Sequence, residues 1–273
     1  MVVFGHVPCR CQRPAVAAVQ PDPGVPGVVD PKTDDIALSV DLADAAGGLR
    51  RDLSAALGVP VTLENDVNLA AVAESRVGAA TGHQDFVLVW IGDGVGMAIM
   101  VGGALHRGST GAAGEIGYLP VPGVALPDRV HRIDQGVFQR LVGSAALVAL
   151  AEEHGLPGDG GDAAGMLAAG LHGSDERHRA FVDAVAERIA LGVAAVAAVL
   201  DPGLVVLSGE TGLAGGSSLA AAVADHVARI APVHPQVTPS TLGESAVLTG
   251  ATHRAVRAAR RELLAGLDDA ADD

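Results

Sequence analysis

Aromatic side chains are scarce in this sequence, with four Phe, one Trp and one Tyr among 273 residues. So few rings cannot build the stacking platforms that grip single strands of nucleic acid. Basic residues are also few, 18 against 32 acidic ones, and the net charge of −14 repels phosphate backbones and anionic membrane surfaces. We therefore expect no nucleic-acid partner for this chain alone and no membrane partner, and any ligand must be held by hydrogen bonds.

Cysteine is nearly absent, since only Cys9 and Cys11 occur and no second pair could complete a zinc site. No zinc and no other metal site is therefore predicted. The opening apolar stretch is too short for a signal peptide, and the longest apolar run, Ile189 to Leu200, falls short of the roughly 20 residues of a membrane span. These features are typical of a cytoplasmic protein, and they favour a buried helix at 189–200.

Apolar residues are plentiful, at 49% of the chain, and can bury a substantial core. Residues 1–14 show no steady period and are expected to form an irregular leader. Residues 156–165 are predicted to be a loop, and 267–273 a solvated acidic tail. Strands are predicted at 15–19, 59–63, 86–91, 97–101, 104–106 and 204–208, and helices at 49–57, 66–76, 134–154, 176–200, 215–230 and 251–266. This alternation predicts an α/β fold, with an antiparallel meander from 86 to 106.

Two clusters near the middle of the chain could carry chemistry. In Glu64-Asn65-Asp66-Val67-Asn68, a carboxylate at a strand-to-helix junction could act as a general base, although Asn65 or Asp66 could equally well only cap the helix. In Gly92-Asp93-Gly94-Val95-Gly96, alternating glycines would let the backbone approach a phosphate. A tight turn between strands explains these glycines equally well.

Two further clusters lie in glycine-rich segments. The loop 111–118 presents one carboxylate, Glu115, for which exposure to solvent is the ordinary explanation. The segment 204–216 is a strand followed by Ser208-Gly209-Glu210, at a position where α/β sheets often contact nucleotides. An ordinary strand-turn-helix connection without a ligand would give the same sequence pattern.

The order of these clusters resembles the ROK family, named for repressors, open reading frames and sugar kinases. The segments that carry the resemblance are GVPGVVD (24–30), VPVTLENDVNLAAVAE (59–74), IGDGVGMAIMVGGALHRGSTGAAGEIGY (91–118) and LDPGLVVLSGETGLAGG (200–216). The resemblance implies a ribonuclease H-like, actin/hexokinase-type fold of two lobes. It places an incomplete N-terminal lobe at 15–80 and a C-terminal lobe at 81–266.

The resemblance also implies roles for individual residues. Asp66 corresponds to the catalytic base that takes a proton from a sugar hydroxyl, and Asn65 and Glu115 would hold sugar hydroxyls. Gly27 lies where the family's loop approaches the sugar. The turn residues Gly92, Asp93, Gly94 and Gly96 would border ATP phosphates, and Gly209 and Glu210 the nucleoside.

The sequence departs from the family pattern at several points. No D-x-G-x-T hairpin, which manages Mg²⁺ and phosphate in the family's kinases, occurs before residue 15. Tyr118 replaces a His beside the sugar, Gln139 stands where a Glu would touch it, and no Cys follows Cys11, so the family's zinc site is not expected. Tyr118 and Gln139 remain candidate sugar-binding residues.

These departures favour a sugar-sensing domain of the transcriptional-regulator type, or a degenerate paralogue, without a DNA-binding module of its own. The alternative is an ATP-dependent sugar kinase that phosphorylates a hexose or N-acetylhexosamine, and only this alternative requires ATP and Mg²⁺. The expected partner is a small-molecule sugar. An uncovered sheet edge would also favour a homo-oligomer.

Overall fold

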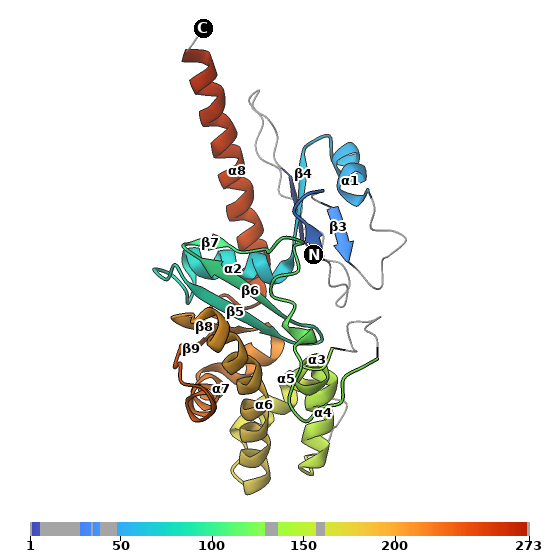
Figure 1. Ribbon diagram of the computed structural model, residues 1–273, viewed down its shortest axis with the longest axis vertical. Helices are drawn as coiled ribbons and strands as arrows, with labels where there is room; N and C mark the ends of the chain where they lie inside the picture. The colour runs from blue at the N-terminus through green and yellow to red at the C-terminus, as the bar shows by residue number, and fades with distance from the viewer. Residues whose placement is uncertain are drawn as a thin grey trace.

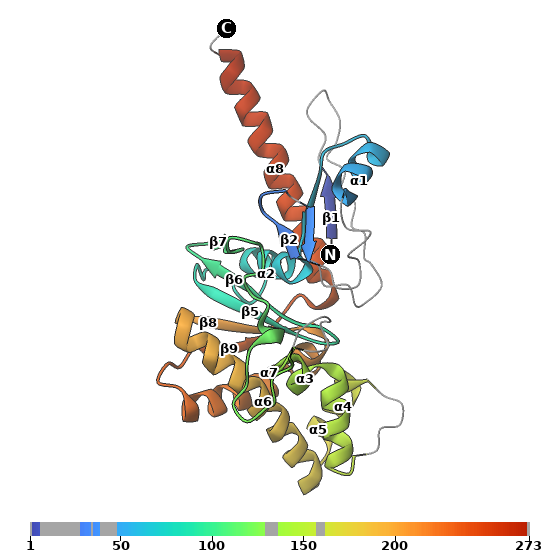
Figure 2. The same ribbon diagram turned by 45° about the vertical axis from the view of Figure 1, so that its right-hand side comes forward.

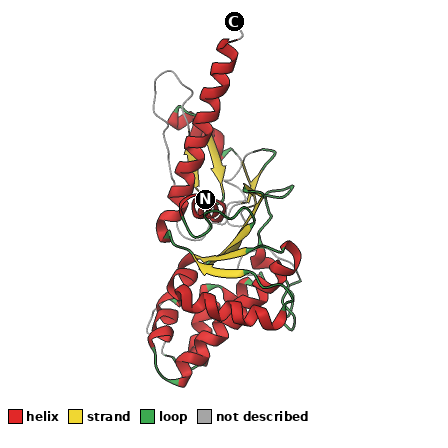
Figure 3. Ribbon diagram, turned by 90° about the vertical axis from the view of Figure 1, so that its left-hand side faces the viewer, coloured by secondary structure: helices red, strands yellow, loops and turns green. Residues whose placement is uncertain are grey.

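A five-stranded sheet crosses the middle of the molecule, with helices on both of its faces (Figures 1 and 3). The computed structural model describes residues 2–5, 28–33, 35–38, 48–128, 136–156 and 162–271. A helical layer lies at one end of the molecule, and a smaller lobe with the long C-terminal helix lies at the other (Figure 1). The molecule is therefore a layered α/β structure, as the alternation of elements predicts.

The sheet has the order β7-β6-β5-β8-β9. Its strands are β5 (Phe86–Ile91), β6 (Val95–Val101), β7 (Ala104–Leu105), β8 (Leu204–Ser208) and β9 (Gln236–Pro239). The first three form the predicted antiparallel meander, whereas β8 pairs with β5 in parallel and β9 with β8 in parallel. The glycine-rich turn 92–94 thus joins the two strands at the centre of the meander.

The central strand β5 is apolar on both sides because both faces of the sheet are covered. Val87, Val89 and Ile91 pack against the helices α3 (Gln139–Val142), α4 (Ser144–Glu153), α5 (Ala163–His172), α6 (Glu176–Leu200) and α7 (Gly209–Ile230). The alternate residues Phe86 and Leu88 pack against α2 (Asp66–Val77) and the beginning of α8 (Ala246–Ala271). The two-residue period of the strand therefore divides the core into two layers.

Helices α2 and α8 approach each other closely through small residues. Ala251 and Ala255 of α8 are fully buried against Leu69 of α2. At Gly250, a Cβ atom would lie 1.9 Å from the backbone oxygen of Leu69. This crossing connects the C-terminal helix to the beginning of α2, where the first chemical cluster lies.

In its described residues, the smaller lobe contains two short pairs of strands and one helix (Figure 2). They are β1 (Val2–Gly5) antiparallel to β4 (Val61–Glu64), β2 (Val28–Asp30) antiparallel to β3 (Asp35–Leu38), and α1 (Leu49–Leu57). Val29, Ile36, Val61 and Leu63 form its small core. Strand β4 leads directly into α2, so this lobe is continuous with the layer above the large sheet.

Several sequence predictions are wrong at the ends of the chain. The leader prediction fails at residues 2–5, because β1 obtains its hydrogen bonds from β4, a distant partner that four residues cannot reveal by their own period. The helix predicted at 251–266 runs from 246 to 271, so most of the predicted acidic tail 267–273 is helical. The strand predicted at 15–19 lies outside the described residues.

Other predictions err inside the chain. The helix predicted at 134–154 is divided at Gly143, whose extended backbone separates α3 from α4. Helix α5 begins within the predicted loop 156–165, where Asp162 caps it, and β9 is absent from the prediction. Helix α7 begins at Gly209 rather than 215, and its turns before and after Gly216 are separated by a non-helical backbone at that residue. Among the described helices, none is long and apolar enough to cross a membrane.

Candidate functional site

The junction of β4 and α2 places the first cluster at a helix N-terminus. Asn65 is the N-cap, and its side-chain oxygen accepts a hydrogen bond of 3.1 Å from the Asn68 amide. Asp66 is the first helical residue and is half-buried, and its Oδ1 accepts from the Val67 amide at 2.9 Å. Capping thus falls to Asn65, and Asp66 lies in the first turn of the helix.

A small cavity lies beside this junction, and Glu115 reaches it from the loop after β7. Its volume is about 20 Å³, which is room for about one water molecule. The residues that line it are Val28, Asn65, Val67, Asn68, Gly96, Met97, Gly111, Ala113, Gly114 and Glu115. The cavity therefore brings together β2, the start of α2, strand β6 and the Glu115 loop.

Gly114 holds the Glu115 loop against β6. Its φ of +101° is in the left-handed region, and a Cβ there would lie 1.9 Å from the Met97 oxygen. The Met97 amide donates to the Gly114 oxygen at 2.8 Å. Only glycine tolerates both this φ and so close an approach, so the loop is fixed with its carboxylate at the cavity.

The carboxylates of Glu115 and Asp66 are electrostatically coupled. Burial raises the pKa of Glu115 above its ordinary value, and the negative charge of Asp66 raises it further. Glu115, Asn65 and Asn68 line the cavity, and Asp66 is not among the lining residues, although its charge acts on Glu115. The side-chain oxygens of the lining residues make a site rich in hydrogen-bond acceptors. Hydroxyl groups of a ligand would donate to such a site.

The raised pKa of Glu115 predicts a pH-dependent stability. Ionised Glu115 is disfavoured in the folded protein, so its contribution to the free energy of unfolding is expected to fall as pH rises from the ordinary pKa of 4.5 through the raised value. Urea unfolding of the wild type and Glu115→Gln across this range should show the variant gaining relative stability with rising pH. The exposed Glu187→Gln serves as the control. The same trend in both variants would contradict a special role for Glu115.

Glu64 belongs to the same junction and was assigned no role from the sequence. It is only 2% exposed, and its Oε2 accepts from Arg107 Nε at 3.1 Å and from Arg254 Nη1 at 2.6 Å. Its Oε1 accepts from Asn68 Nδ2 at 2.9 Å. A charged residue at the end of an apolar strand is the only local signal for this role. The sequence does not predict the two arginine partners, because they lie 43 and 190 positions away.

Gln139 holds the glycine-rich turn instead of lining the cavity. Its Oε1 accepts from the Val95 amide at 2.8 Å, and its Nε2 donates to the Asp93 oxygen at 2.6 Å. Gly96 lines the cavity, whereas Gly92, Asp93 and Gly94 form the turn beyond it. Tyr118, in the short helix η1 (Ile116–Tyr118), is half-buried and is not among the lining residues.

The second and fourth clusters meet at the carboxyl end of the sheet. A Cβ at Gly92 would lie 1.9 Å from Glu210 Oε2, and Gly209, at φ +75°, lies against the Ile91 backbone. The hydroxyls of Ser208 and Thr211 are buried and have no hydrogen-bond partner within the described part of the chain. Helix α7 begins here, and the free amide groups of a helix N-terminus can bind anionic groups such as phosphate.

One predicted site residue cannot be assigned to either group. Gly27 lies outside the described residues. In the described ranges, no three side chains of His, Cys, Asp or Glu gather as a metal site. The structure thus brings Asn65, Glu115 and Gly96 to one cavity, with Asp66 near enough to act on Glu115 but outside the lining, and it brings Gly92, Gly209 and Glu210 to a second centre.

The fold and this pair of centres define an α/β protein of the actin/hexokinase-like class. A solved structure of a ROK family glucokinase from Streptomyces griseus, in complex with glucose and AMPPNP, is similar at a TM-score of 0.73 and 25% identity, covering 86% of this chain and 80% of that one. The ROK family model matches residues 17–257. The chain belongs to the ROK family.

Curated relatives include both enzymes and a repressor. The bifunctional enzyme NanE/NanK of Brucella suis biovar 1 is 34% identical over 204 residues, which are 74% of this chain and 36% of the relative. A putative xylose repressor of Caldicellulosiruptor sp. is 25% identical over 203 residues, which are 70% of this chain and 50% of the relative. The chain thus matches about a third to a half of the length of these relatives.

Proposed function

We propose that the protein binds a sugar at the cavity beside the β4–α2 junction and acts as a sugar-sensing domain. The observation that carries this proposal is that Asn65, Asn68 and Glu115 line one cavity, while the charge of Asp66 acts on Glu115. Carboxylate and amide oxygens accept hydrogen bonds from hydroxyls with directional preference. A polyhydroxylated ligand without net charge matches these acceptors.

The size of the cavity supports sensing. Its volume of about 20 Å³ is smaller than a hexose, and we infer that the elements around it move apart when a sugar enters. A ligand shifts such an equilibrium by binding one state better than the other. The Glu115 loop and β2 belong to different parts of the chain and meet at the cavity, so their separation would report occupancy.

A sugar kinase is the second candidate, and the contact between Gly92 and Glu210 favours it. This contact puts the glycine-rich turn beside the beginning of α7, where the amide groups of the helix N-terminus could bind nucleotide phosphates. ATP bound there would supply the phosphoryl group. Asp66 would accept the proton of the attacking sugar hydroxyl, and Asn65 and Glu115 would orient the sugar.

Two measurements on the wild-type protein separate these candidates. Calorimetric titration with hexoses and N-acetylhexosamines is expected to show weak, saturable binding of at least one sugar. Sugar-dependent ADP release with Mg-ATP is expected to be absent. Turnover at ordinary kinase rates, about 1 to 100 per second, would establish the kinase instead. Failure of every sugar to bind would overturn both candidates.

Four further predictions from the sequence remain predictions: a cytoplasmic location, self-association, the absence of zinc and a lobe boundary near residue 80.

A further inference from the structure

A second, larger cavity lies between α8, α2 and the β6–β7 hairpin, and two of its lining residues, Arg107 and Arg254, donate to Glu64. Its volume is about 680 Å³, within the usual range for small-molecule sites of about 300 to 1,000 Å³. Six arginines line it, and we call it the arginine groove: Arg76, Arg107, Arg254, Arg257, Arg260 and Arg261. No acidic residue is among its described lining residues.

The charge of the groove is opposite to that of the protein. Six of the chain's 18 basic residues gather here, although the net charge is −14. Helix α8 supplies four of them within two turns, and α2 and the segment after β7 supply the other two. Because three separate elements converge, the cluster is not merely the solvated face of one helix.

The positive charges of the groove repel one another. Burial lowers the pKa of Arg254, and the positive charges of Arg107, Arg261 and Arg257 lower it further, while Glu64 acts in the opposite direction. Arg76, Arg257, Arg260 and Arg261 form no ion pair with any side chain that the structure describes. An anion in the groove would relieve this repulsion and receive several charge-assisted hydrogen bonds.

The lining also has an apolar part, formed by Val72, Met100, Leu105 and Val256. Arginine guanidinium groups match phosphate oxygens in a two-point geometry. The combination of guanidinium groups and apolar side chains suits a ligand that has both phosphate and an organic body. We propose that the arginine groove is a binding site for a small phosphorylated metabolite, separate from the sugar cavity.

The groove and the sugar cavity share one carboxylate. Glu64 Oε2 accepts from Arg107 and Arg254, which line the groove, while Glu64 Oε1 accepts from Asn68, which lines the small cavity. A phosphate in the groove would compete with Glu64 for the same guanidinium donors. Occupation of the groove would therefore act directly on the element that carries Asn65 and Asp66.

Calorimetric titration with pyrophosphate, inorganic phosphate, glucose 6-phosphate and glucose tests the proposal. We expect saturable binding of glucose 6-phosphate that exceeds binding of inorganic phosphate, and weakening of that binding by added salt. The double variant Arg257→Gln/Arg260→Gln should bind it at least tenfold more weakly. The control Arg177→Gln/Arg179→Gln removes the same charge from exposed positions on α6 and should bind normally. Thermal unfolding verifies that both variants are folded.

Each other outcome overturns the proposal in a defined way. Equal weakening in the two double variants would mean nonspecific attraction to net charge. Binding of inorganic phosphate or pyrophosphate as tight as that of the sugar ester would mean a simple anion site. Tighter binding of a short oligonucleotide duplex than of any phosphorylated metabolite would mean a nucleic-acid surface. Absence of saturable binding to the wild type would mean that the groove is no ligand site. Glucose itself reports binding at the small cavity, and only binding that Arg257→Gln/Arg260→Gln weakens belongs to the groove. Glucose 6-phosphate binding that this variant leaves unchanged would place the ligand at the small cavity, so the two proposals can fail separately.

Discussion

Asp66→Ala is expected to weaken sugar binding by about 10-fold to 100-fold. A hydrogen bond to a charged group contributes about 1.5 to 3 kcal/mol, and each 1.4 kcal/mol is about tenfold in affinity. The substitution also removes the charge that raises the pKa of Glu115, so that pKa should move back toward its ordinary value. Calorimetric titration with the best-bound sugar measures the first effect. The pH dependence of binding measures the second.

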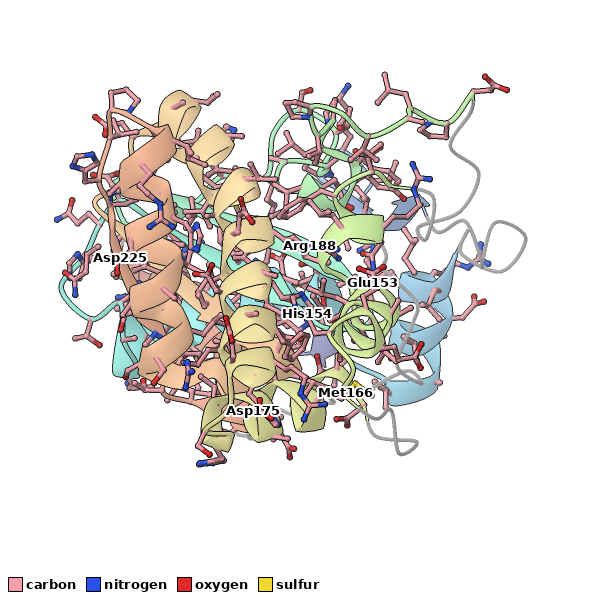
Figure 4. All side chains as sticks on the ribbon, turned by 90° about the horizontal axis from the view of Figure 1, so that it is seen from below. Glu153, His154, Met166, Asp175, Arg188 and Asp225 are labelled. Atoms are coloured by element: carbon pink, nitrogen blue, oxygen red, sulfur yellow. The ribbon has the colours of Figure 1, made fainter. Side chains whose placement is uncertain are left out.

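The control for this prediction is Asp225→Ala. Asp225 is exposed on α7, in the helical layer seen in Figure 4, and it is not among the residues lining either cavity. Its removal subtracts the same charge from the protein and should leave the affinity unchanged. Undiminished sugar binding in Asp66→Ala would remove Asp66 from the site. An equal loss in both variants would assign the effect to net charge.

The Asp66→Asn variant distinguishes sensing from catalysis. The amide keeps an oxygen acceptor, so sugar binding should fall less than in Asp66→Ala. If the wild type has kinase activity, the loss of a general base should lower its turnover about 100-fold to 10,000-fold. A large loss of turnover with nearly intact binding would therefore identify Asp66 as a base. An equal loss of both would identify it as a ligand for the sugar alone.

Glu64→Gln is expected to destabilise the protein by about 3 kcal/mol. Removing one partner of a buried ion pair usually costs about 3 to 5 kcal/mol, because the other charge loses its compensation. The lower end applies because the side chains of Arg107 and Arg254 are 29% and 27% exposed and can partly regain water. Urea unfolding of the variant measures the loss of stability.

Glu187→Gln is the matched control for Glu64, since it makes the same change at an exposed position of α6. Its effect should be within about 0.5 kcal/mol of zero, as for most surface substitutions. If Glu64→Gln costs no more than this control, the two arginines are stabilised by solvent rather than by the carboxylate. The link between the arginine groove and the sugar cavity would then lose its physical basis.

Helix 176–200 and the strands 86–91 and 204–208 were predicted with their observed limits. Their signals are local: Asp175 caps the helix, and Asp201 ends it in a left-handed conformation. Each strand is a short apolar run, which in the second strand ends with Ser208. Strand β1 and strand β9 lack such signals. Both depend on a partner strand that is distant in the sequence, and a short segment does not reveal its partner.

The candidate site also has parts that local sequence signals predict and parts that depend on distant segments. Residue type and spacing predict two parts of it, the capping position of Asn65 and the glycine-rich turn 92–96. Both are predictable because caps and tight turns require particular side chains within a few positions. The sequence also supported the family and its α/β fold, through several motifs in a consistent order.

The hydrogen-bond partners of Gln139 and Glu64 could be identified only from the tertiary structure. Gln139 could hold either a sugar or the backbone of the turn, and only the meeting of α3 with the β5–β6 turn directs its amide to Asp93 and Val95. The pairing of Glu64 with Arg107 and Arg254 joins residues separated by 43 and 190 positions. Hydrogen-bond partners and charge clusters of this kind depend on which distant segments pack together. The order of residues along the chain contains no local signal for that packing.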